Sequence, residues 1–306
     1  MFKIMTLLIL FASIVGCSSK VNNTYNDLVS PDLTKTKRQA EYKTSAPTLG
    51  IAFGGGGVRG FMHLGVIKAL KEANIHANVV TGVSAGSIAA VFYASGMDYQ
   101  HLENTINNVE MSDVLDITLS SRGFIDGARL SDWINSQVKQ SDLTQMPIPI
   151  GLVATNLSQQ KSMLITKGNP GHAVQASSSI PGAFIPVENQ GNVLVDGGLL
   201  DVVPVNYTRE LGADVVIGVD IYCGNQAAPS IDQSGMQITF SSFRMLTCKL
   251  SEADLNSADI LIQPNFDLQS DSEEEKQAAI NAGYMAAKAV LPKIRHALLS
   301  QKISEL

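Results

Sequence analysis

The stretch TLGIAFGGGGVRG, residues 48–60, joins a short β-rich run to four consecutive glycines. A helical pattern follows over residues 58–72, because apolar side chains recur there every three or four positions. These apolar positions are Phe61, Leu64, Ile67 and Leu70. The order strand, glycine-rich turn, helix predicts that the chain opens its folded part with a βα unit.

A second unit of the same order comes next, with a strand at 79–80, a turn at 82–86 and a helix at 87–94. Later apolar runs are short and β-branched, as buried strands of a parallel sheet are. They cover residues 148–155, 192–198, 214–222 and 258–264. An amphipathic pattern over 273–299 closes the chain. We predict an α/β fold, a three-layer sandwich with a mainly parallel central sheet.

The composition fits one large domain with a buried core. The chain has 306 residues, of which 45% are hydrophobic and 16% charged, with a formal net charge of −6. It has no cluster of Lys and Arg interleaved with aromatic residues, so nucleic acid is not an expected partner. It also has no Cys/His cluster with the spacing of metal ligands, so we expect no metal site.

The first residues, MFKIMTLLILFASIVGC, place Lys3 before an apolar run at 4–15. This run is too short to span a bilayer but suits a signal peptide, which we assign to residues 1–16. The tetrapeptide IVGC, ending at Cys17, resembles the lipobox of bacterial lipoproteins, where the cysteine becomes the acylated first residue. An ordinary signal peptide, or a buried apolar segment with an incidental cysteine, is the alternative.

Residues 17–46 are polar and lack an apolar period, so we expect a lipidated N-terminus and flexible tether before a catalytic domain at 47–306. The protein is then exported and anchored to a membrane through Cys17. Ser18 after the cysteine resembles the pattern for the outer membrane, facing the periplasm, if the source is Gram-negative. In an oxidising compartment Cys223 and Cys248 could pair, and their spacing leaves a disulfide and two free thiols both open.

The first glycine turn contains G-x-G-x-x-G at Gly55, Gly57 and Gly60, which alone suggests a dinucleotide site. That site needs an acidic residue at the end of the second strand, and residues 80–84 contain none. A phosphate-binding P-loop also fails, because Phe61 stands where Lys is required. Neither nucleotide motif is therefore complete.

A run of glycines can instead aim backbone N–H groups at one point and stabilise an oxyanion. We expect Gly55, Gly56 and Gly57 to be the donors. Arg59 and Gly60 follow them and are expected to support the loop, Arg59 through its several N–H donors or by attracting an anionic head group.

The second turn reads Gly82-x-Ser84-x-Gly86 and matches the nucleophile elbow, a sharp corner between strand and helix that exposes a serine. The alternative is a serine that only caps the next helix. The run of glycines that could stabilise an oxyanion precedes this turn by one βα unit. We therefore predict that Ser84 is the nucleophile.

The proton acceptor for Ser84 is the next requirement. Only His296 follows in the chain order of a Ser-Asp-His triad, and it lies within the terminal helical pattern. Asp196 ends an apolar strand and precedes Gly197 and Gly198, so its carboxylate is the better candidate for a general base. Its alternative role is to open a tight Asp-Gly turn.

GGGGVRG, GVSAGS and VDGG in this order resemble the oxyanion loop, nucleophile elbow and catalytic Asp-Gly-Gly of the patatin-like phospholipases. The resemblance runs over residues 49–264 and includes RGFIDGARL at 122–130 and ASSSIPGAFIPV at 176–187. It implies a Ser84/Asp196 dyad without histidine that hydrolyses carboxylic esters of lipids through an acyl-enzyme, as a phospholipase A or lysophospholipase, with no cofactor. One departure follows the Asp-Gly-Gly motif, where many relatives have asparagine before the proline and this chain reads LLDVVP at 199–204. Asp201 in this stretch could compete for the serine.

Two other functions stay open at this point. A Ser-His-Asp esterase for soluble esters would depend on His296, and a non-catalytic lipid or anion binder would keep only the glycine loop. Residues 97–130 have weak periodicity and could form a lid or merely connecting helices.

Overall fold

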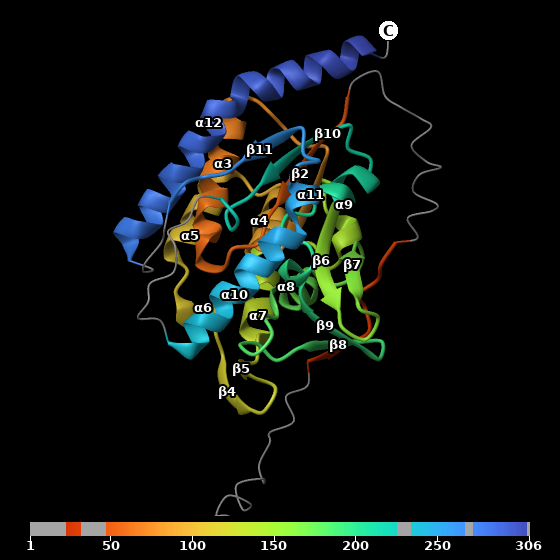
Figure 1. Ribbon diagram of the computed structural model, residues 1–306, viewed down its shortest axis with the longest axis vertical. Helices are drawn as coiled ribbons and strands as arrows, with labels where there is room; N and C mark the ends of the chain where they lie inside the picture. Colours follow the sequence, from red (N-terminus) through yellow and green to blue (C-terminus); the bar gives the residue numbers. More distant parts are fainter. Residues whose placement is uncertain (1–22, 32–46, 225–233, 267–271, 305–306) are drawn as a thin grey trace, which may run out of the picture.

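The computed structural model describes residues 23–31, 47–224, 234–266 and 272–304, which form a mixed α/β fold around a central sheet (Figure 1). The strand order is β1-β8-β9-β6-β3-β2-β10-β11, and β7 also pairs with β6. The strands are β1 (Thr24–Tyr25), β2 (Leu49–Phe53), β3 (Val79–Val83), β6 (Ile150–Asn156), β7 (Lys161–Ile165), β8 (Val187–Asn189), β9 (Asn192–Asp196), β10 (Val215–Val219) and β11 (Ile260–Ile262). The hairpin β4 (Ile117–Ser120) and β5 (Gly123–Ile125) stands apart from this sheet.

Helices cover both faces of the sheet, because alternate residues of each central strand pack into different cores. Ile51 and Phe53 of β2 belong to the larger apolar cluster, whereas Ala52 between them belongs to a second cluster on the other face. The helices are η1 (Gly57–Gly60), α3 (Phe61–Glu72), α4 (Ala85–Ala94), α5 (Tyr99–Asn108), α6 (Met111–Val114), α7 (Ala128–Gln137), η2 (Leu143–Gln145), α8 (Pro170–Ser178), η3 (Gly197–Leu199), α9 (Val205–Glu210), α10 (Gly235–Leu250), α11 (Glu252–Leu255) and α12 (Glu273–Ser304). The predicted three-layer arrangement is confirmed.

All six strands expected from the sequence are present, and five of them, β6, β3, β2, β10 and β11, run parallel. The sixth, β9, differs from the expectation because it runs antiparallel to β6. Its short neighbour β8 precedes it in a hairpin, and a hairpin connection forces the two strands to reverse direction.

Residues 23–31 differ from the expected flexible tether. Thr24 and Tyr25 form β1, which pairs with β8, and Leu28 is 1% exposed. The Tyr25 hydroxyl donates to Oε1 of Gln175 at 2.5 Å, and its ring stacks on His172. Folded structure therefore begins well before Thr48, since a buried leucine and a tyrosine fasten this segment to the domain.

Residues 1–22 lie outside the described part of the chain, and the expected signal peptide, lipobox and Cys17 lie among them. In the described ranges, we find no helix that combines the length and the hydropathy needed to cross a membrane.

Candidate active site

Ser84 occupies a sharp corner between β3 and α4. Its backbone has φ 52° and ψ −124°, a conformation that is strained for a residue with a side chain. The corner is held from both sides, since the Ser84 amide donates to Oγ of Ser177 at 3.0 Å and the Ser84 carbonyl accepts from the Ser87 amide at 2.8 Å. The sharp corner between strand and helix that the sequence predicted is thus present at Ser84.

The glycines on either side of this corner permit a close crossing of backbones. A methyl group on Gly82 would overlap the carbonyl of Gly86, and one on Gly86 would overlap the carbonyl of Phe53 at the end of β2. The strand and helix can therefore meet this tightly only if both positions lack a Cβ atom.

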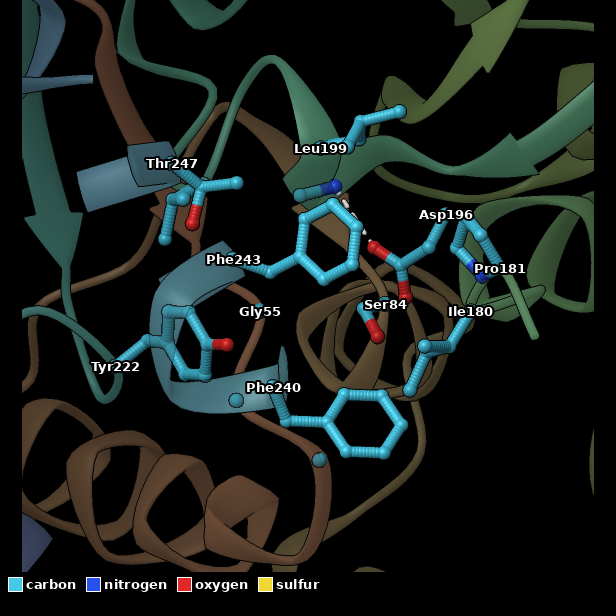
Figure 2. A pocket seen from close by; sticks show the side chains of 14 residues that line it. Gly55, Ser84, Ile180, Pro181, Asp196, Leu199, Tyr222, Phe240, Phe243 and Thr247 are labelled. Atoms are coloured by element: carbon cyan, nitrogen blue, oxygen red, sulfur yellow. Dashed lines mark hydrogen bonds between the residues drawn. The ribbon is translucent and has the colours of Figure 1, made fainter. Parts of the chain in front are cut away.

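Asp196 reaches Ser84 through the register of three neighbouring strands. Val83 of β3 pairs with Val153 of β6, and the next residue of β6, Ala154, pairs with Asp196. Strand β9 pairs only with residues 154–156 at the C-terminal end of β6, whereas β3 pairs with residues 150–153. The last residue of β9 therefore lies level with the last residue of β3, although β9 and β3 run in opposite directions. The carboxylate consequently lies beside the serine in Figure 2.

The Asp196 side chain is buried, and burial raises its pKa from 3.8 to about 6. Hydrogen bonds from the Ser84 side chain and the Gly198 amide partly oppose this rise in pKa. The Gly198 amide donates to Oδ1 at 2.7 Å, drawn as a dashed line in Figure 2, and so fixes the carboxylate. This arrangement leaves a carboxylate at neutral pH that is more basic than an ordinary aspartate.

The glycine loop approaches the same point. A methyl group at Gly55 would lie 3.4 Å from the Cβ of Ser84. The Gly55 amide, expected as an oxyanion donor, instead donates to the Val202 carbonyl at 2.9 Å. The amides of Gly56 and Gly57 have no hydrogen-bond acceptor among the described residues. Of the three amides that we expected to bind an oxyanion, only those of Gly56 and Gly57 thus lack an acceptor in the described structure.

A buried histidine forms a hydrogen bond with the glycine loop. His63 of α3 donates through Nε2 to the Gly54 carbonyl at 2.8 Å, and burial lowers its pKa to about 4, so the ring is neutral near pH 7. Arg59 and Gly60 lie in η1, where a methyl group at Gly60 would be 3.1 Å from the Cβ of Ala85. The η1 turn thus packs against the first residue of α4, next to Ser84.

Ser84 and Asp196 open into an apolar pocket of about 140 Å³ (Figure 2). The sequence did not indicate most of its lining residues. They are Ile180 and Pro181 after α8, Leu199 of η3, Val202, Tyr222, and Phe240, Phe243 and Thr247 of α10. A capping box formed by Ser234 and Gln237 begins α10, and this S-x-x-Q pattern was the signal that could have located the helix.

A disulfide between Cys223 and Cys248 answers the pairing question that the sequence left open. It joins the segment after β10, which carries Tyr222, to α10, which carries Phe243 and Thr247. The disulfide therefore fastens one apolar wall of the pocket to the sheet.

We expect reduction of this disulfide, or Cys248→Ser, to loosen α10. A disulfide across a separation of 25 residues contributes about 3 kcal/mol through the entropy of the open chain. Hydrogen exchange should accelerate in α10 while β2 and β3 stay protected, and turnover of a long-chain ester should fall about threefold to tenfold. Unchanged exchange in α10 after complete reduction would contradict this role.

Other residues considered as participants lie elsewhere. None of the five histidines lines the pocket, and His296 is exposed on α12. Asp201 bonds with Asp254 of α11, and burial together with this neighbour raises its pKa. No residue in 97–130 lines the pocket, and this region forms α5, α6, the hairpin of β4 and β5, and the start of α7.

Comparison with known proteins agrees with this geometry. The family model described as patatin-like phospholipase matches residues 51–209, which is more than half of the chain. The chain belongs to the patatin-like phospholipase family. The matched region of this patatin-like chain contains the glycine loop, Ser84 and Asp196 but ends before α10.

Curated relatives match part of this patatin-like protein. An uncharacterized NTE family protein of Mycobacterium bovis is 32% identical over 62% of this chain and 53% of its own length, so the chain spans about half of that relative. Lysophospholipase NTE1 of Chaetomium globosum is 29% identical over 57% of this chain and 12% of its own length. VipD from Legionella pneumophila shares the fold, with 15% identity, a TM-score of 0.53, and coverage of 92% of this chain and 72% of that one.

Proposed function

We propose that this protein is a lipid acyl hydrolase of the phospholipase A or lysophospholipase type, which acts through Ser84 and Asp196. The observation that carries the proposal is that Ser84 and the buried carboxylate of Asp196 lie side by side in the lining of one apolar pocket (Figure 2). Two amides, of Gly56 and Gly57, remain available at the same pocket. A nucleophile, a base and oxyanion donors thus meet at one point.

The chemistry follows from these positions. Asp196 accepts the hydroxyl proton while Oγ of Ser84 attacks the ester carbonyl carbon. The carbonyl oxygen becomes negatively charged and accepts hydrogen bonds from the amides of Gly56 and Gly57. The carbonyl re-forms, the alcohol leaves with the proton from Asp196, and an acyl group remains on Ser84. Water, deprotonated by Asp196, then attacks the acyl carbon. The bond from that carbon to Oγ of Ser84 breaks, Oγ takes the proton back from Asp196, and the fatty acid is released.

The lining of the pocket supports an apolar acyl group as the part of the substrate that it binds. Phe240, Phe243 and Ile180 present hydrocarbon around the serine. One relative is named a lysophospholipase, which supports a phospholipid or lysophospholipid substrate. We further propose export, acylation of Cys17 and residence at a membrane, which is the outer membrane facing the periplasm if the source is Gram-negative.

A fluorophosphonate probe tests the nucleophile directly. We expect stoichiometric labelling of the folded protein, with the adduct mapped by mass spectrometry to the peptide containing Ser84, because such probes react with activated serines. Incubation with a panel of defined phospholipids and lysophospholipids then identifies the released acids. Labelling at another serine would overturn Ser84 as the nucleophile, and no labelling would leave a lipid-binding protein without catalysis.

A further inference from the structure

Helix α10 exposes apolar side chains on the side that faces away from the pocket. Phe240 and Phe243 line the pocket, whereas Ile238, Met245 and Leu246 do not. Those three are 52%, 72% and 54% exposed. With 3.6 residues per turn, Ile238 and Met245 share one face, roughly opposite to Phe240. That face also carries the exposed polar side chains of Ser242 and Lys249, so Ile238 and Met245 place hydrocarbon in water on a face of mixed polarity.

The apolar surface continues around the mouth of the pocket. Val58 follows the lining residue Gly57 and is 46% exposed, and Leu200 follows the lining residue Leu199 and is 40% exposed. Phe240 and Phe243 are themselves 41% and 46% exposed. Hydrocarbon therefore extends from the interior of the pocket to the outer surface of the molecule, and such patches mark interaction sites.

The charge of α10 differs from that of the whole chain. The helix contains Arg244 and Lys249 and no acidic residue, whereas the chain has a formal net charge of −6. Lys249 is 78% exposed and pairs with Glu252 of α11, and Arg244 donates to the Tyr222 carbonyl at 2.9 Å. A helix with exposed hydrocarbon and no acidic side chain can lie in the interface of a bilayer that contains anionic lipid without charge repulsion from its own residues.

We propose that the outer face of α10 inserts into the surface of an anionic lipid bilayer and sets the mouth of the pocket against the lipid layer. This inference rests on the proposed function, because docking would serve lipid hydrolysis. An acyl chain could then pass from the bilayer to Ser84 between apolar side chains without crossing water. It goes beyond that function because it assigns the docking surface to Ile238, Met245 and Leu246. A lipid anchor on Cys17 alone would tether the protein without inserting α10.

Local insertion is measured with Met245→Trp, made in the full chain with Ser84→Ala so that the vesicles stay intact. The matched control is Met285→Trp, on α12, because Met285 is 58% exposed and does not line the pocket. Trp133, the one natural tryptophan, gives the baseline. On vesicles of brominated phosphatidylcholine with phosphatidylglycerol, we expect about twofold or greater quenching for position 245 and none beyond baseline for position 285. Equal quenching at both, or none at 245, overturns the proposal and leaves a protein partner for this face.

A kinetic comparison in the active protein separates docking from catalysis. The combined change Ile238→Ser, Met245→Ser and Leu246→Ser should reduce hydrolysis of phosphatidylglycerol vesicles about tenfold and leave hydrolysis of a short soluble ester unchanged. Vesicle hydrolysis at the unaltered rate would overturn the docking surface while the hydrolase stands. If the unaltered protein hydrolyses neither substrate, the proposed function fails, and the quenching measurement still decides whether α10 inserts.

Discussion

Ser84→Ala is expected to lower kcat for ester hydrolysis by about four powers of ten and to abolish fluorophosphonate labelling. The reason is that the proposed mechanism passes through an acyl group bound to Oγ of this residue, so the variant retains only binding and the oxyanion donors. The fold should persist, because the bonds that hold the corner involve the Ser84 backbone rather than its side chain. Kinetics with a chromogenic short-chain ester, together with circular dichroism, measures both effects.

The matched control for this change is Ser178→Ala. Ser178 is a buried serine one residue from Ser177, and its hydroxyl has no hydrogen-bond partner in the described structure. Its removal should leave kcat within about twofold, because it neither lines the pocket nor bonds to the elbow. An equal loss of activity in both variants would mean that Ser84 acts through packing and not as the nucleophile.

The sequence predicted the central elements because their signals are local. A short apolar strand followed by glycines has few structural alternatives, and the elbow glycines are needed for a close backbone crossing that any such corner requires. The sequence also predicted that Asp196 ends an apolar strand, but it did not indicate how that strand brings the side chain to Ser84. Its strand is antiparallel, and only the pairing of Ala154 with Asp196 brings the carboxylate to Ser84.

The features that were missed depend on contacts between distant segments. The sequence does not show that the Gly55 amide donates to the carbonyl of Val202, which lies 147 positions later, so it could not distinguish Gly55 from Gly56 and Gly57. The wall formed by α10 depends on a disulfide whose geometry spacing cannot decide. The N-terminal segment is polar, and its attachment through Tyr25 and Leu28 rests on partners in the second half of the domain.

Asp196→Asn should have opposite effects on activity and stability. Activity should fall by about three to four powers of ten, because the amide cannot accept the Ser84 proton. In the unaltered protein, kcat/KM should fall as the pH drops through about 6, because protonation of Asp196 removes the base. This profile requires a base with the raised pKa, and a profile flat down to pH 4.5 would contradict it.

Asp201→Asn and His296→Ala are the controls for the loss of activity. Asp201 is a half-buried aspartate whose pKa is also raised, but it bonds with Asp254 and does not line the pocket. His296 is the one histidine that a Ser-Asp-His order would use, and it is exposed on α12. Both variants should keep kcat within about threefold. If Asp201→Asn loses activity and Asp196→Asn does not, the base is Asp201.

The stability effect has a definite sign. Below pH 3.8 Asp196 is protonated in the folded and unfolded protein, so it imposes no penalty. Between pH 3.8 and about 6 the unfolded chain ionises first, and the free energy of unfolding falls as the pH rises. Above about pH 6 the buried charge costs about 3 kcal/mol. Asn keeps an oxygen that accepts the hydrogen bond from the Gly198 amide but carries no charge. Urea denaturation at pH 8 should therefore give Asp196→Asn a higher free energy of unfolding than the unaltered protein, by up to about 3 kcal/mol. This difference should shrink as the pH falls toward 4. A constant difference across this range would mean that the carboxylate does not carry the raised pKa on which its role as base depends.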